Sequence, residues 1–121
     1  MYDDIKKLFP EEVKINKWVE KVGESERDIS LDLLLTKNPV CNIKLQELLT
    51  EEGFYIEYKD EAKLRSQEIY EGRSYKEMGL TSYRIIITNN SLRLMAHGQK
   101  KNKGPDVLLE ISSKFVKSLY K

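Results

Sequence analysis

Hydrophobic and polar residues alternate most regularly in the second half of the chain. Residues 82–88 are rich in β-branched side chains and predict a strand, and residues 91–96 predict a second strand. Asn89 and Asn90 between them favour a tight hairpin turn, because asparagine tolerates positive φ. Residues 54–58 alternate in the same way, so we expect a further strand there.

Two other segments place their hydrophobic residues at helical spacing. Residues 40–52 form one apolar face, and Gly53 suits the end of that helix. Gly104, Pro105 and Asp106 are typical of a helix start. The helix that follows repeats an apolar residue every four positions, at Val107, Ile111, Phe115 and Leu119. This stripe predicts a helix that packs on a sheet.

The first 37 residues read as helical. Residues 3–9 predict a short helical turn stopped by Pro10, and a second helix is expected from Pro10 to Gly23. Its apolar stripe consists of Val13, Ile15, Trp18, Val19 and Val22. Residues 29–35 fit either a third short helix or an extended segment. The sequence therefore predicts an N-terminal helical extension over residues 1–37.

From residue 38 onward the expected order is helix, strand, long connection, strand, strand and helix. Residues 59–80 are polar and fit a long loop, or a strand that runs on into a connection. The prediction is an α+β fold with α-β-β-β-α order, in which a three-stranded antiparallel sheet packs on two helices. Residues 38–121 would form this domain, preceded by the helical extension.

The composition of the chain indicates the cellular compartment in which we expect the protein. The chain has 121 residues, a net charge of +1 and one cysteine, which cannot form an internal disulfide. No apolar run reaches the length of a membrane span, and no signal-peptide pattern opens the chain. We expect an intracellular protein without a membrane partner, in the cytoplasm or the nucleus.

Candidates for catalytic chemistry are few. His97 and Cys41 are the single histidine and cysteine, too few for a structural zinc site, and phosphate-loop and nucleophile-elbow motifs are missing. The acidic residues that remain are Asp60, Glu61, Glu68 and Glu71 as a hard-metal site, and Asp106 with Glu110 as a nuclease pair. A solvated face and helix-end electrostatics explain them better. We therefore expect a binding protein that is not an enzyme and holds no metal or cofactor.

A basic cluster is the most informative polar feature. Residues 93–103 contain Arg93 and three lysines, Lys100, Lys101 and Lys103, without an acidic residue. The lysines directly precede the last helix, whose free N–H groups and dipole favour anions. Such a cluster can contact phosphates, whereas the alternative is a lysine-rich loop that only aids solubility.

The chain resembles the double-stranded RNA-binding domain family over residues 38–121. The stretch 38–40 together with 45–53, Glu57 and Tyr58 is similar to the first helix and first strand of that family. Ala96-His97-Gly98, followed by the three lysines, is similar to the turn before its second helix. The chain departs from the family at residues 69–79, which lack the histidine of the usual first loop.

The resemblance implies binding to the grooves and phosphates of an A-form duplex. It implies an RNA site made of Gln46, Glu47, Arg73, Lys76, His97, Lys100, Lys101 and Lys103. Members of this family also pair with each other or with other proteins. A protein-interaction or dimerisation domain of the same fold, as a homodimer or with another protein, is therefore the alternative. An unrelated α+β module resembling bacterial pleckstrin-homology domains, and a metal-dependent nuclease, also remain open.

Overall fold

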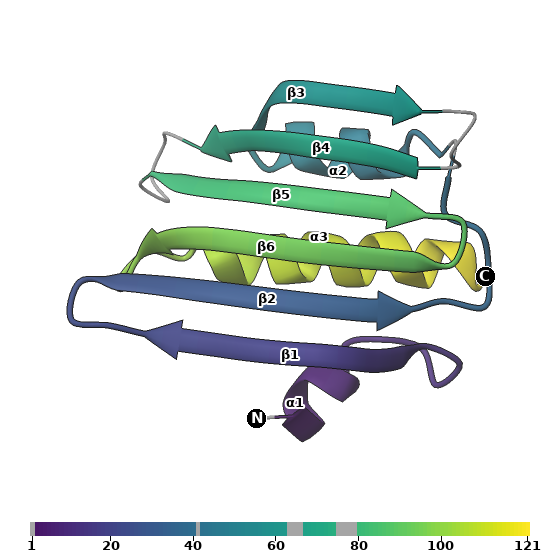
Figure 1. The fold of residues 1–121 in the computed structure, drawn as a ribbon, viewed down its shortest axis with the longest axis horizontal. Helices are drawn as coiled ribbons and strands as arrows, with labels where there is room; N and C mark the ends of the chain where they lie inside the picture. Colours follow the sequence, from purple (N-terminus) through teal and green to yellow (C-terminus); the bar gives the residue numbers. More distant parts are fainter. Residues whose placement is uncertain (1, 41, 63–66, 75–79) are drawn as a thin grey trace.

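The computed structural model describes residues 2–40, 42–62, 67–74 and 80–121, which form three helices and six strands. The helices are α1 (Tyr2–Lys6), α2 (Lys44–Glu51) and α3 (Gly104–Leu119). The strands are β1 (Lys14–Val22), β2 (Glu26–Leu34), β3 (Tyr55–Ala62), β4 (Gln67–Ser74), β5 (Thr81–Thr88) and β6 (Ser91–Gln99). All of these strands belong to one antiparallel sheet (Figure 1).

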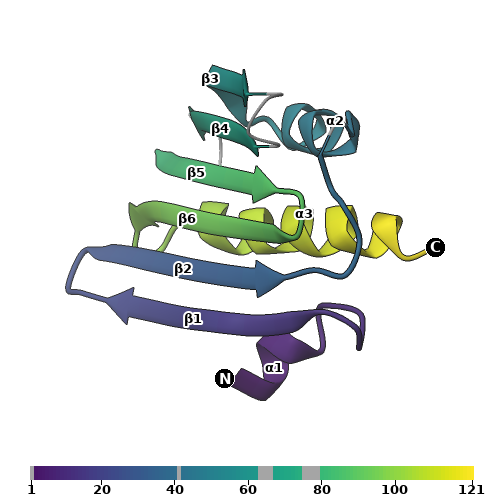
Figure 2. The same ribbon diagram turned by 45° about the vertical axis from the view of Figure 1, so that its right-hand side comes forward.

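The sheet has the strand order β1-β2-β6-β5-β4-β3. Strands β3 to β6 form a meander in which each strand pairs with the next. The β1–β2 hairpin joins this meander through β6, because β2 pairs with β6 along its whole length (Figure 2). Strand β6 therefore connects the two parts of the sheet.

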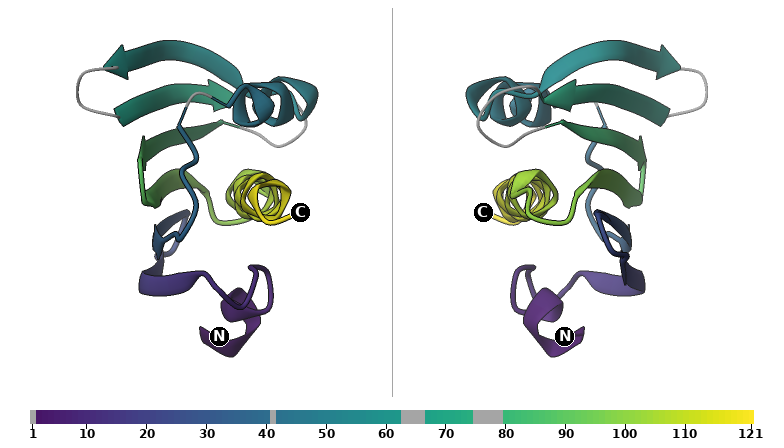
Figure 3. Two further views of the ribbon diagram at one scale, coloured as in Figure 1. Left: turned by 90° about the vertical axis from the view of Figure 1, so that its right-hand side faces the viewer. Right: turned by 90° about the vertical axis from the view of Figure 1, so that its left-hand side faces the viewer.

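The helices lie on one side of the sheet (Figure 3). Alternate residues of the strands face them, because successive side chains of a strand point to opposite faces. The buried strand residues include Ile29, Leu31, Leu33, Ile85, Ile87, Leu92 and Leu94. The helices contribute Leu45, Leu48 and Leu49 from α2, and Leu108, Ile111, Phe115 and Val116 from α3. The hydrophobic core thus lies between the sheet and these two helices.

The expected helix over residues 10–23 is wrong, because residues 14–22 form β1. A β-bulge interrupts the pairing of β1 with β2 between Ile15 and Lys17. Ile15 pairs with Leu33 and Trp18 with Leu31, so both residues face the helices although they are three positions apart. The bulge therefore converts the two-residue spacing of a strand into the three-residue spacing that is typical of a helix.

The predicted fold class is also wrong. The described residues form a six-stranded sheet with three helices, instead of a three-stranded sheet on two helices with a helical extension. Besides β1, residues 26–34 form β2, and most of the expected loop over residues 59–80 belongs to β3 and β4. In β4 the residues on the helix side are Glu68, Tyr70, Gly72 and Ser74, of which Tyr70 alone is hydrophobic. This strand therefore lacks the alternating pattern that sequence analysis detects.

The C-terminal half agrees better with the expectations. The hairpin with Asn89 and Asn90 at its turn is confirmed, since these residues separate β5 from β6. The two expected helices correspond to α2 and α3. Gly53 follows α2 with a φ of 84°, a conformation in which glycine avoids the steric cost of a Cβ atom.

A close approach between β3 and β4 occurs at Gly72. The Tyr83 hydroxyl donates a hydrogen bond of 3.0 Å to the carbonyl oxygen of Tyr55 beside it. A Cβ atom at Gly72 would lie 1.6 Å from that carbonyl oxygen and 2.9 Å from the Tyr83 hydroxyl oxygen. The bulge of β3 between Ile56 and Tyr58 lies next to this point. Glycine is therefore required where the edge strand β3 bends over its neighbour.

Candidate interaction surface

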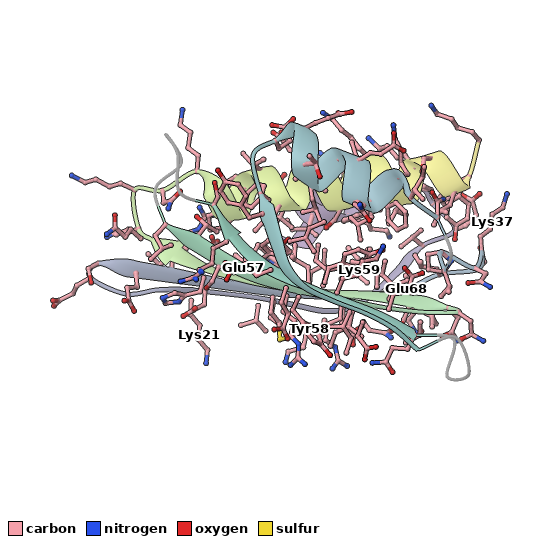
Figure 4. All side chains as sticks on the ribbon, turned by 90° about the horizontal axis from the view of Figure 1, so that it is seen from above. Lys21, Lys37, Glu57, Tyr58, Lys59 and Glu68 are labelled. Carbon is pink, nitrogen blue, oxygen red and sulfur yellow. The ribbon has the colours of Figure 1, made fainter. Side chains whose placement is uncertain are left out.

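The open face of the sheet, defined as the side turned away from α2 and α3, is not covered by any of the described helices (Figure 3). Figure 4 shows Lys21 and Tyr58 on this side, while Lys59 and Glu68 lie between the sheet and the helices. By strand order and register, the open face carries Lys14, Lys17, Val19 and Lys21 from β1; Asp28, Ser30, Asp32 and Leu34 from β2; Ser91, Arg93, Met95, His97 and Gln99 from β6; Ser82, Arg84, Ile86 and Thr88 from β5; Gln67, Ile69, Glu71 and Arg73 from β4; and Tyr55, Tyr58 and Asp60 from β3.

Ion pairs between neighbouring strands occupy the middle of the open face. Arg84 on β5 contacts Glu71 on β4 at 2.8 Å, and Arg93 on β6 contacts Asp32 on β2 at 3.4 Å. A third pair, between Arg73 and Glu57 at 2.7 Å, lies at the side of β3, and it lowers the pKa of the Glu57 carboxyl group. Cross-strand pairs of opposite charge stabilise a sheet modestly. These groups already neutralise one another within the chain.

Hydrophobic side chains are interspersed with these ion pairs. Val19, Ile69, Ile86 and Met95 are half-buried although no described helix covers them. Tyr55 and Tyr58 on β3 expose 50% and 48% of their surface. Contiguous apolar groups on the uncovered face of a sheet mark contact sites for other molecules.

His97 lies in a shallow hollow of the open face with a volume of about 480 Å³. Its Nδ1 atom is hydrogen-bonded to Asp28 Oδ1 on β2, and its Nε2 atom lies 3.7 Å from Glu26 Oε2. The hydrogen bond to Asp28 raises the pKa of the imidazole, because it favours the charged form. The surroundings of His97 therefore favour its positively charged form, which lies between the carboxylates of Asp28 and Glu26.

Ser82 on β5 is the direct neighbour of His97 on the side away from Asp28. The three residue types of a hydrolytic triad therefore lie in one row across the sheet. Among the described residues, however, no hydrogen bond joins Ser82 to His97, whose second ring nitrogen faces Glu26 instead. A triad needs that hydrogen bond and oxyanion donors beside it, so this row offers no assembled nucleophile.

The three lysines of the expected phosphate site follow β6 directly. Lys100, Lys101 and Lys103 are all exposed, and Lys103 is the residue that precedes the first turn of α3. The backbone N–H of Lys100 donates a hydrogen bond to the carbonyl oxygen of Ser25, which fixes this turn against the β1–β2 hairpin. The lysines therefore lie where the sequence predicts them, at the start of the last helix.

The start of α3 itself has little capacity left for an anion. The Asn102 side-chain oxygen accepts the Gly104 N–H at 2.8 Å, and Pro105 has no N–H. The Asp106 carboxylate in the same turn is held by Arg27, with Nη–Oδ distances of 2.9 and 2.7 Å. The Arg27 guanidinium lowers the pKa of Asp106 accordingly. An anion at this place would be bound by the lysine ammonium groups and not by the helix end.

The other expected RNA contacts lie on different faces of the molecule. Gln46 and Glu47 are exposed on α2, and Gln46 Oε1 accepts a hydrogen bond of 2.8 Å from Lys59 Nζ. Arg73 and His97 lie on the open face, on the opposite side of the sheet. Lys76 lies outside the described residues. The structure therefore brings Arg73 and His97 together but separates them from the two helix residues.

Of the acidic residues considered for metal or nuclease chemistry, Asp60 and Glu71 lie on the open face, and the side chain of Glu61 lies outside what the structure describes. Within residues 2–40, 42–62, 67–74 and 80–121 no group of three or more histidine, cysteine, aspartate or glutamate side chains could hold a metal ion. Glu68 is buried on the helix side, where it accepts a hydrogen bond of 2.8 Å from the Tyr70 hydroxyl. Asp106 is bound to Arg27, as described above, and Glu110 is exposed one turn further on.

Comparison of the chain with family models, curated proteins and solved structures found no match. Among the helices of the described residues, none is both long and apolar enough to cross a membrane.

Sequence reasoning missed the open face as a unit. Its half-buried hydrophobic members, Val19, Ile69, Ile86 and Met95, come from four different strands and are separated in the sequence by charged residues. Two of these strands, β1 and β4, were expected as a helix and as a connection. The one available signal for the open face was the run of Ile85, Ile86 and Ile87 in β5. Successive residues of a strand point to opposite faces, so this strand is hydrophobic on both faces and has two contact surfaces.

Proposed function

We propose that this protein is a non-catalytic protein-interaction module whose contact surface is the open face of the sheet. One observation carries the proposal: the half-buried Ile69, Ile86 and Met95, on the adjacent strands β4, β5 and β6, form an apolar centre among ion pairs that are already satisfied within the chain. Covering this face removes apolar surface from water without leaving those charges unpaired. This combination of an apolar centre and a polar surround is typical of protein interfaces.

Affinity capture with matched variants tests this proposal. Ile86→Glu and Met95→Glu place a charge in the apolar centre of the open face, and Lys114→Glu and Lys117→Glu change exposed residues of α3 on the other side. We expect proteins bound by the parent chain, including further copies of itself, to be lost from the first pair of variants and retained by the second. An identical set of bound proteins for all variants would overturn the proposal.

A second candidate function is binding to double-stranded RNA. It is supported by the exposure of Lys100, Lys101 and Lys103 on one turn, where ion pairs to them are missing among the described residues. Phosphate contacts of this kind are independent of sequence and depend strongly on salt. The separation of Gln46 and Glu47 from the lysine turn argues for contact with one stretch of phosphates, not for the full two-groove contact that the resemblance implies.

The RNA candidate is tested by titration with duplex RNA at several salt concentrations. Changing the three lysines of the turn to alanine should weaken binding and reduce the salt slope by roughly 0.7–0.9 for each lost phosphate contact. A control with the same charge change replaces Lys114, Lys117 and Lys121 at the end of α3, which should leave binding unchanged. Equal binding by both triple variants would exclude the lysine turn as the RNA site.

A further inference from the structure

We infer that the occupant of the open face is a second copy of this chain, packed sheet against sheet about a two-fold axis that runs parallel to the strands between β6 and β5. This inference rests on the proposed function, since it names the partner of the same surface. In this arrangement β1 of one copy lies over β3 of the partner copy, β2 over β4, and β6 over β5.

The charge distribution on the open face is the first argument. The side of β1 carries three exposed lysines, Lys14, Lys17 and Lys21, and no acidic residue. The side of β3, at the opposite edge of the sheet, carries Asp60 together with Tyr55 and Tyr58, while Glu57 at the bulge is already paired with Arg73. Within the described part of the chain, no ion pair is made by the three lysines or by Asp60. The open face therefore carries three lysines at one edge and the carboxylate of Asp60 at the other.

A two-fold interface requires a surface that is complementary to itself. Rotation about an axis parallel to the strands exchanges the two edges, so the lysines of β1 come to lie over Asp60 and the tyrosines of the partner copy. The same rotation places Asp28 of β2 opposite the partner copy's Arg73. Sheets packed face to face cross at about 30°, which shifts residues along the strands but keeps these edges opposite one another. Lysine can then pair with a carboxylate or lie over a tyrosine ring.

The centre of the face has the composition that such contact needs. Strands β6 and β5 flank the axis, so Met95 of one copy lies against the Ile86 and Arg84 region of the partner copy. The charged residues of the centre, Arg84 and Arg93, are paired within each copy with Glu71 and Asp32. Their charge is therefore compensated before the two sheets meet, which reduces the cost of removing them from water.

The available area is sufficient for a stable dimer. Six strands spaced by about 4.8 Å, each contributing roughly seven residues at 3.4 Å, give a face of about 700 Å². Stable interfaces bury about 800 Å² on each partner, counted as accessible surface, which exceeds the flat projection of the same patch. The open face is therefore of the size that one copy presents in a typical dimer.

Association through the sheet edges is disfavoured by comparison. Each edge strand carries a β-bulge, between Ile15 and Lys17 in β1 and between Ile56 and Tyr58 in β3. Bulges disrupt the row of free hydrogen-bonding groups that a new strand would need, and lysines along β1 add to this protection. The face, and not the edge, is the surface left for a second copy.

Sedimentation equilibrium of the full chain over a range of concentrations tests the inference. The parent should approach twice the monomer mass of 14.2 kDa. Lys17→Glu combined with Lys21→Glu should weaken dimerisation at least tenfold, because the acidic edges then face each other. Adding Asp60→Lys to this double variant should restore the dimer, because it reverses both edges. Lys114→Glu with Lys117→Glu on α3 is the control and should dimerise like the parent.

The outcomes separate this inference from the proposed function. A parent chain that stays at 14.2 kDa at high concentration overturns the inference, whereas capture of another protein that depends on Met95 would leave the proposed function intact. A dimer that the double variant leaves unchanged, or that Asp60→Lys does not restore, overturns the arrangement. Circular dichroism and thermal unfolding of each variant confirm that a loss of mass reflects lost association and not unfolding, since the four lysines are exposed and Asp60 is partly exposed.

Discussion

The guanidinium group of Arg27 binds both carboxylate oxygens of Asp106 by two parallel hydrogen bonds of 2.9 and 2.7 Å. The same guanidinium donates a third hydrogen bond of 2.8 Å, from Nε to Glu20. These contacts join β1 and β2 to the first turn of α3, across most of the length of the chain. The two carboxylates raise the pKa of Arg27, with Asp106 as the larger cause.

Asp106→Asn should lower the free energy of unfolding by about 1 kcal/mol at neutral pH, because the Asp106 side chain is 54% exposed and solvent screens the pair. The pKa of Asp106 is lowered in the folded state, so its contribution is present above the unfolded value of about 3.9 and is lost as pH falls through the folded value. Urea unfolding at pH 7 and pH 3 measures both effects. Glu110→Gln, one turn further along α3, should change stability little at either pH.

Gly72→Ala should destabilise the fold by about 2–3 kcal/mol, because the new Cβ atom would lie 1.6 Å from the Tyr55 carbonyl oxygen and force β3 away from β4. Gly23→Ala is the matched control, since a Cβ atom there meets its nearest neighbour at an ordinary 3.5 Å. Thermal unfolding of both variants compares them directly. Equal melting temperatures would show that the contact at Gly72 is not as close as described.

The pKa of His97 should lie above its usual value of about 6.5, because the hydrogen bond to Asp28 favours the charged ring. Asp28→Asn should lower it, whereas Asp32→Asn, which removes the partner of Arg93 on the same strand, should leave it unchanged. The chain has one histidine, so a single imidazole resonance followed by NMR gives the value. The stabilisation from this pair is fully present below about pH 6.5 and is lost as pH rises through the folded pKa. If the pKa of His97 is the same in the Asp28→Asn and Asp32→Asn variants, Asp28 is not the cause of the raised pKa.

Tyr120→Phe should destabilise the protein by about 1 kcal/mol, because the Tyr120 hydroxyl oxygen accepts the backbone N–H of Thr36 at 2.9 Å and is hydrogen-bonded to its side-chain hydroxyl at the same distance. These bonds fasten the residue after α3 to the segment after β2. Tyr58→Phe, on the open face, removes a hydroxyl from a side chain that is 48% exposed and should have little effect. Chemical unfolding of the two variants provides the comparison.

Much of the local structure could be predicted from the sequence in those segments where the hydrophobic period and the turn residues indicate the same element. The β5–β6 hairpin follows from its β-branched residues and from Asn89 and Asn90, and α3 follows from a regular apolar stripe. The prediction failed where the chain departs from a simple period. The bulge after Ile15 imitates helical spacing, and the helix side of β4 is filled by Glu68, Gly72 and Ser74 beside a single tyrosine. One undetected hairpin and one undetected strand were enough to change the architecture.

Of the described residues that the sequence singled out for RNA binding, only Arg73 and His97 lie on the open face, and the surface as a whole was not predicted. The lysines after β6 lie where the sequence placed them, at the start of α3. Arg73 and His97 lie in one row across the open face with Ser82 between them, a relation that follows from the pairing of β4 and β6 with β5 and that the local sequence does not indicate. A resemblance carried by short motifs could not reveal that Gln46 lies on the other side of the sheet.

The position of β6 between the two parts of the sheet has a consequence for the order of folding. The hairpin of residues 14–34 is synthesised before β3, β4 and β5, yet its partner strand begins only at Ser91, so its docking must wait until β6 has been made. A nascent or truncated chain that ends before Ser91 contains a two-stranded ribbon and a separate three-stranded ribbon with nothing to join them. We therefore expect synthesis of the β6–α3 unit, Ser91 to Leu119, to convert two unstable fragments into one cooperative fold.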